Sequence, residues 1–112
     1  MSNNNQKIQR LARYLKKNPG DSFTKFALAL ELLKQDQVSR AQMLFESVLE
    51  QDPKYLGVYY HLGKLYEKIG RFDDAKKLYQ NGIDVAVEQN HERTKIELRE
   101  ALAELNLELD DQ

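Results

Sequence analysis

The sequence predicts an all-α protein built from antiparallel pairs of helices, and three observations support this prediction. Asn18-Pro19 and Asp52-Pro53 lie 34 residues apart, and each follows one apolar-periodic segment and precedes another. Within these segments, apolar residues recur at i, i+3, i+4 and i+7, which is the spacing of one helix face. Two short breaks, "QDQVS" and "IGRFD", divide the segments into pairs.

Residues 22–55 and 56–89 align at this offset as two repeat units of two helices each. Identities are few, but the residue classes agree, as in the pairs Phe26/Tyr60, Ala29/Gly63 and Phe45/Tyr79. Gly63 stands in the middle of a predicted helix, where glycine costs about 1 kcal/mol relative to alanine. We therefore expect the two helices of the second unit to cross closely there, with Gly63 facing Ala75.

Helix starts and stops are predicted from local signals. Ser39 with Gln42 forms a capping box, and Asp73 occupies the equivalent N-cap position in the second unit. Val87 stands where a proline would end the second unit, so we expect that helix to continue to "EQNHE".

Two flanking segments extend the register. A leading helix over about 6–17 carries Ile8, Leu11 and Leu15 on one face, and a capping helix is predicted over about 92–106. Six helices, equivalent to three pairs, are about the minimum that buries a continuous core by stacking, so we predict one domain over residues 1–112.

Composition excludes several classes of protein. The 112 residues include 17 basic and 18 acidic ones, so the net charge of −1 gives no electrostatic reason to expect nucleic acid or an anionic membrane as a partner. There is no cysteine, and no apolar run approaches the roughly 18 residues that span a bilayer. The expected location is the cytoplasm, since "MSNNNQKIQR" lacks the apolar core of a signal peptide.

The pattern resembles the tetratricopeptide repeat. The second unit carries the family's positions as Tyr59, Leu62-Gly63, Tyr66, Gly70, Ala75, Tyr79 and Gly82, and the first as Leu28-Ala29, Leu32, Ala41, Phe45 and Pro53. The first unit departs at Lys25, where a large apolar residue belongs, and at Asp36, where the turn glycine belongs. The resemblance implies a right-handed α-solenoid whose first helices line a concave groove.

The resemblance also implies a protein interaction module, or adaptor, that binds a peptide or helix of a partner in this groove. The residues expected to line it are Phe23, Phe26, Leu30, Leu33, Tyr60, His61, Lys64 and Leu98. Phe26 and Leu30 stand where carboxylate-clamping relatives place lysine and asparagine, so we do not expect recognition of acidic C-termini. An amphipathic helix or an apolar-anchored peptide is the expected ligand.

Two alternatives stay open at this point. Phe23 and Phe26 could pack under the leading helix around Leu11 and Tyr14 instead of lining a groove. The final helix shows two apolar faces, so it could cover the groove or pair with a second copy, which would make the protein a self-associating homodimer.

No enzyme is expected. The sequence offers no nucleophile with a base at a matching spacing, no phosphate-binding glycine loop and no metal-ligand cluster, so neither a cofactor nor a metal is predicted. Four lysines, Lys34, Lys64, Lys68 and Lys95, could form a short basic stripe, but Glu67 and large apolar residues share that face. Nucleic acid is therefore not expected as a partner.

Overall fold

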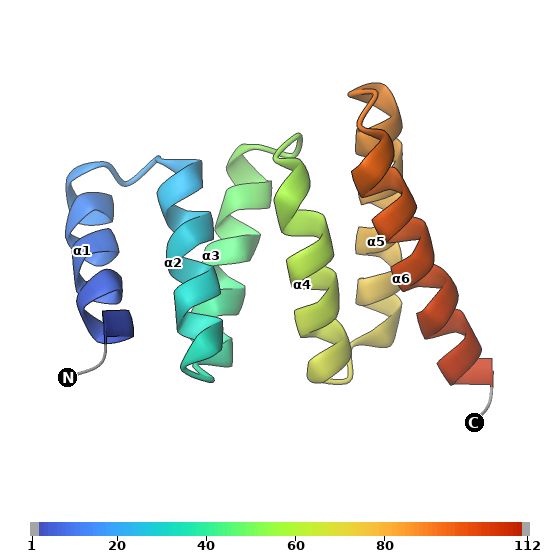
Figure 1. The fold of residues 1–112 in the computed structure, drawn as a ribbon, viewed down its shortest axis with the longest axis horizontal. Helices are drawn as coiled ribbons and strands as arrows, with labels where there is room; N and C mark the ends of the chain where they lie inside the picture. Colours follow the sequence, from blue (N-terminus) through green and yellow to red (C-terminus); the bar gives the residue numbers. More distant parts are fainter. Residues whose placement is uncertain (1–2, 111–112) are drawn as a thin grey trace. The chain divides into compact units, whose positions relative to one another are not determined.

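The structure is a computed structural model that describes residues 3–110, and it contains six α-helices and no strand in that range. The helices are α1 (Asn3–Lys17), α2 (Ser22–Lys34), α3 (Val38–Gln51), α4 (Leu56–Lys68), α5 (Phe72–Glu88) and α6 (Glu92–Asp110), shown in Figure 1. The predicted all-α class and the number of helices are confirmed. Helix α1 begins before residue 6, and α6 continues past residue 106.

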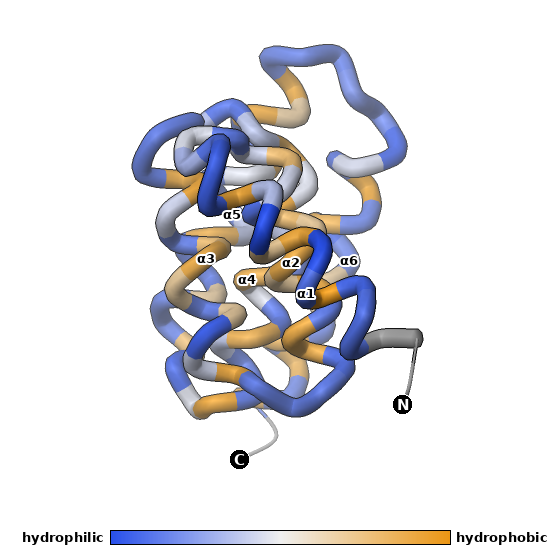
Figure 2. The backbone as a smooth tube through the Cα atoms, turned by 90° about the vertical axis from the view of Figure 1, so that its left-hand side faces the viewer, coloured by the Kyte–Doolittle hydropathy of each residue, from blue (hydrophilic) through white to orange (hydrophobic). Residues whose placement is uncertain are grey.

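The chain forms two compact units, residues 1–55 and 56–112. The first contains α1 to α3 and the second α4 to α6, and within each unit successive helices run antiparallel (Figure 1). Each helix contains both hydrophobic and hydrophilic residues (Figure 2), as expected for helices that bury one face. None of the described helices is both long enough and apolar enough to cross a membrane.

Three of the turns between helices share one geometry. A residue in the left-handed region follows α2, α4 and α5, at Asp36 (φ 59°), Gly70 (φ 83°) and Asn90 (φ 56°). The next residue then donates its N–H to a carbonyl five positions earlier, as Arg71 does to Tyr66 at 2.8 Å. This is the Schellman arrangement that ends helices, and Asp and Asn are the non-glycine residues that best tolerate its backbone.

The predicted caps of α3 and α5 are wrong. These helices start at Val38 and Phe72, with Gln37 and Arg71 at the N-cap and no side-chain capping bond. The Schellman turn places those residues directly at the helix start, so Ser39 and Asp73 fall inside the first turn. Asp73 still favours the helix there because its charge opposes the positive end of the helix dipole.

In the second unit, two glycines allow large aromatic rings into the core. A Cβ added at Gly63 would lie 2.2 Å from Cε1 of Tyr79, and one added at Gly82 would lie 2.7 Å from Cβ of Tyr59. The close approach expected at Gly63 is therefore present. The nearest group is the Tyr79 ring, whereas Ala75 had been expected at this position.

The first unit buries two charged side chains. Lys25 is 9% exposed, and its Nζ donates to Ser47 Oγ at 2.8 Å and to Gln51 Oε1 at 2.7 Å. Glu31 is 3% exposed, and its Oε1 accepts from Lys34 at 3.0 Å and from Lys7 of α1 at 3.1 Å. These bonds hold the pKa of the Glu31 carboxyl below its usual value, with Lys34 the largest cause and Lys7 the next.

Candidate functional site

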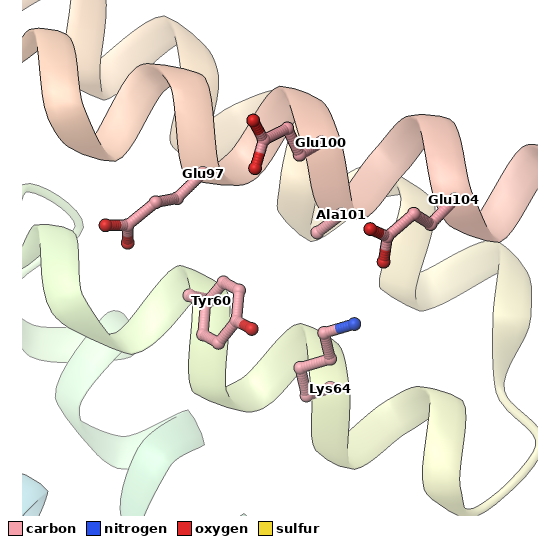
Figure 3. A pocket seen from close by; sticks show the side chains of 6 residues that line it. All are labelled: Tyr60, Lys64, Glu97, Glu100, Ala101 and Glu104. Atoms are coloured by element: carbon pink, nitrogen blue, oxygen red, sulfur yellow. The ribbon is translucent and has the colours of Figure 1, made fainter.

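A cleft of about 130 Å³ lies within the second unit, between α4 and α6. Its lining residues, which we call the acidic cleft, are Tyr60, Lys64, Glu97, Glu100, Ala101 and Glu104. Figure 3 shows the α6 carboxylates across from the Tyr60 ring and the Lys64 ammonium. Both walls are helices of one unit, so the site rests on regular structure.

The helical repeat explains how these side chains come together. Glu97, Glu100 and Glu104 are spaced by three and four residues, which places them on one side of α6. The adjacent side of α6 carries Leu98 and Leu105, both buried, which anchor the helix. Because one side is fixed in the core, the three carboxylates must face the opening toward α4.

Negative charge dominates the cleft, because three carboxylates face one ammonium. Glu97 pairs with Arg93 at 3.2 Å, on the same helix. Glu100 and Glu104 form no hydrogen bond or ion pair with another described residue. These two carboxylates are therefore available to accept hydrogen bonds from a ligand.

A chain of contacts fixes the α4 wall. The Tyr79 hydroxyl donates to the Glu67 carboxylate, and Glu67 Oε2 lies 3.7 Å from Lys64 Nζ. The Lys64 ammonium in turn lies 5.8 Å from the centroid of the Tyr60 ring. Burial, followed by the bond to Glu67, raises the pKa of Tyr79, so the phenol stays protonated and remains a donor.

His61 supports the Tyr60 ring from the side. The two ring centroids are 5.5 Å apart and the planes are nearly perpendicular, an edge-to-face arrangement. Burial lowers the pKa of His61, so the imidazole is neutral at pH 7. We conclude that His61 orients Tyr60 and adds no positive charge to the site.

The predicted groove residues do not share one environment. Tyr60 and Lys64 line the acidic cleft. Phe26 packs within the first unit, with ring centroids 5.9 Å from Phe45 and 5.4 Å from Tyr55. Phe23 is 66% exposed. The remaining α2 residues, Leu30 and Leu33, are half-buried, and their role in binding stays a prediction.

The prediction that Leu98 lines the groove is wrong. Leu98 is fully buried, and its Cδ1 would lie only 2.8 Å from a Cβ added at Gly82. The glycine draws α5 close to α6, and this contact covers the leucine. The three glutamates of α6 take its place at the surface, and their spacing beside the apolar stripe was the signal that could have identified them.

The acidic cleft is suited to binding an organic cation. Among the described residues, no group of three His, Cys, Asp or Glu side chains is arranged to hold a metal ion. Carboxylates and a tyrosine ring together instead match a guanidinium or ammonium group, which pairs with the former and stacks on the latter.

The fold and this site together define a helical-repeat protein with a side-chain-sized cleft on its second unit. The model of the family described as tetratricopeptide repeat matches residues 32–95, more than half of the chain. The chain belongs to the tetratricopeptide repeat family. A search of curated proteins gave no significant match.

Solved structures agree with this family. A tetratricopeptide repeat domain protein from Salinibacter ruber is 50% identical, with a TM-score of 0.74 over 77% of this chain and 96% of that one. Protein BPP2914 from Bordetella parapertussis has a TM-score of 0.78 at 23% identity, over 90% of this chain and 88% of that one. The TPR2B domain of yeast Sti1, solved in a complex with pHsp70, has a TM-score of 0.83 at 15% identity, over 90% and 81%. The last two likenesses concern the fold alone.

Proposed function

We propose that this protein is an interaction module whose acidic cleft receives a basic side chain from a segment of another protein chain. The observation that supports this most strongly is the pair of unpaired carboxylates, Glu100 and Glu104, beside the Tyr60 ring. A peptide with arginine or lysine on one face would satisfy them. The ligand of this site is thus basic, and not anchored by apolar residues alone.

The size of the cleft favours a single side chain over a whole helix. Its volume of about 130 Å³ is close to that of a cavity of about 150 Å³ that holds benzene. A planar guanidinium fits such a space, stacks on an aromatic ring and donates to carboxylates in a fork. The position of Lys64 Nζ, 5.8 Å from the centroid of the Tyr60 ring, supports the placement of a cation beside this ring.

The family supports the general role. Tetratricopeptide repeats act as protein interaction modules, and the Sti1 domain was solved with a protein partner. An adaptor without catalytic activity, located in the cytoplasm, remains the expectation from the sequence.

The test is a binding titration followed by fluorescence anisotropy. The probe is a labelled, alanine-based helical peptide with three arginines spaced by three and four residues. We expect Glu100→Gln with Glu104→Gln to weaken binding about tenfold, since each exposed charge pair contributes up to about 1 kcal/mol. Tyr60→Ala should weaken it as well, because the stacking surface is lost.

The matched control is Glu50→Gln with Asp84→Asn, which changes the net charge equally at exposed positions outside the cleft. This variant should bind like the wild type. Equal affinity of the cleft variant and the control variant would refute the proposed site. A peptide with glutamines in place of the arginines should not bind either protein.

A further inference from the structure

We infer that the basic side chain received by the acidic cleft belongs to helix α1 of a second copy of this chain. This inference rests on the proposed function, because it names the occupant of the same site. The charges are strongly divided between the terminal helices. Helix α1 contains five basic and no acidic residues, whereas α6 contains six acidic and three basic ones.

The outer face of α1 carries what we call the basic stripe, Arg10, Arg13 and Lys17. All three side chains are exposed, and together with Tyr14 they border a shallow hollow on α1. None of the three forms a hydrogen bond or ion pair with another described residue. These cations are therefore available to a partner.

Presenting the basic stripe does not require α1 to leave its unit. The half-buried residues of α1 are Ile8, Leu11 and Leu15, on the opposite face, and α1 packs against α2. The ion pair between Lys7 and Glu31 also joins these two helices. The stripe is thus held on a folded surface, which limits the entropy lost on binding.

The stripe and the cleft match in spacing as well as in sign. Arg10, Arg13 and Lys17 are separated by three and four residues, as are Glu97, Glu100 and Glu104. At 1.5 Å per residue, each set spans about 10 Å of helix. Two helices laid side by side can therefore bring all three pairs together, with an arginine reaching toward Tyr60.

This contact joins different surfaces of the two copies. Such a heterologous interface leaves one stripe and one cleft open after the first contact, so further copies can add. Exposed ion pairs are individually weak, and salt screens them, since the Debye length falls from about 10 Å at 0.1 M to about 3 Å at 1 M. The association should depend on concentration and weaken as salt is added.

The experiment is sedimentation equilibrium of the full chain at several concentrations in 0.05 M and 0.5 M NaCl. The wild type should exceed the 13.1 kDa of one chain at low salt and return toward it at high salt. The stripe variant R10E/R13E/K17E should have a dissociation constant at least tenfold higher. A control that reverses three other exposed cations in two units, K16E/R40E/K77E, should associate like the wild type.

A charge-swapped variant provides the decisive comparison. Reversing the cleft as E97K/E100K/E104K should abolish association, and combining this reversal with the stripe reversal should restore it. The combined variant keeps the wild-type net charge of −1, so restoration cannot result from overall charge. Circular dichroism checks that each variant is folded.

Three outcomes would overturn the inference. The first is a mass of 13.1 kDa for the wild type at every concentration and salt. The second is association that survives the stripe reversal, as a symmetric contact through α6 alone would give. The third is a monomer whose stripe binds an RNA oligonucleotide. In each case, binding of the arginine peptide to the cleft still decides the proposed function separately.

Discussion

The hairpins α2/α3 and α4/α5 are equivalent at an offset of 34 residues, yet they bury side chains of different types at equivalent positions. Lys25 and Glu31 are buried in the first, where Tyr59 and Leu65 are buried in the second. Both charged side chains have hydrogen-bond partners, which offset part of the cost of removing them from water. Only Oε1 of Glu31 is paired, since its Oε2 is buried without a hydrogen-bond partner. A repeat position therefore fixes burial, while the residue type can vary.

The two hairpins also differ where their helices cross, and this difference reaches the surface. At the helix crossing of the second hairpin, Gly63 lies against the Tyr79 ring. The equivalent positions of the first hairpin are Ala29 and Phe45, which are both buried. The added Tyr79 hydroxyl needs an acceptor, which Glu67 supplies. Glu67 also forms an ion pair with Lys64, so it connects the buried Tyr79 hydroxyl to a residue that lines the acidic cleft.

The largest expected effect is at the glycine of the second hairpin. Gly63→Leu should destabilise the protein by about 3 kcal/mol, the upper end of the overpacking range, because even a Cβ there meets a buried ring. Chemical denaturation measures this. Gly20→Leu is a suitable control, since a Cβ there has no neighbour within 4 Å. A Gly63→Leu variant as stable as the wild type would contradict the packing described.

A smaller effect is expected when the polar pair Tyr79 and Glu67 of the second hairpin is replaced by the apolar residues at the equivalent positions of the first. Tyr79→Phe alone should cost about 1.5 kcal/mol, because Glu67 loses a hydrogen bond. Tyr79→Phe combined with Glu67→Leu reproduces Phe45 and Leu33 and should be closer to the wild type. A double-mutant cycle in urea gives the coupling free energy, and strictly additive costs would argue against a direct bond.

The smallest effect concerns Glu31 and depends on pH. Its folded pKa is depressed below 4.5, so its stabilisation is present above that value and is lost as pH falls through the folded pKa. Glu31→Leu copies Leu65 and should be nearly neutral at pH 7, since a well-packed apolar residue can replace a buried ion pair.

The measurement is the urea midpoint at pH 7 and at pH 3. The Glu31→Leu variant should lose less stability between the two than the wild type does. Glu50→Leu, at an exposed position, serves as the control. An identical loss in wild type and Glu31→Leu would show that the carboxylate contributes nothing to acid sensitivity.

Helix order could be predicted from sequence because its signals are local. Pro19 and Pro53 mark two of the boundaries, and the missing proline at Val87 correctly indicated a longer α5. The caps of α3 and α5 could not be predicted this way. Their turns depend on left-handed backbone at Asp36 and Gly70. The sequence does not show that this geometry makes the next helix begin before the predicted cap residue.

The site was only half predictable. Tyr60 and Lys64 follow from their place on the first helix of a pair. Assigning Leu98 failed because α6 has two apolar stripes, and periodicity alone does not decide which one is buried. Finding the glutamates required knowing that α4 and α6 are neighbours, a tertiary fact.

The central claim is that the acidic cleft between α4 and α6 is the surface that binds a partner. A ¹⁵N NMR titration of the wild type with the arginine-containing helical peptide tests it most directly. We predict shift changes at Tyr60, Lys64 and along 97–104 of α6, which diminish as salt is raised. Shift changes confined to α2 around Phe23 and Leu30, or none at all, would contradict binding in the acidic cleft.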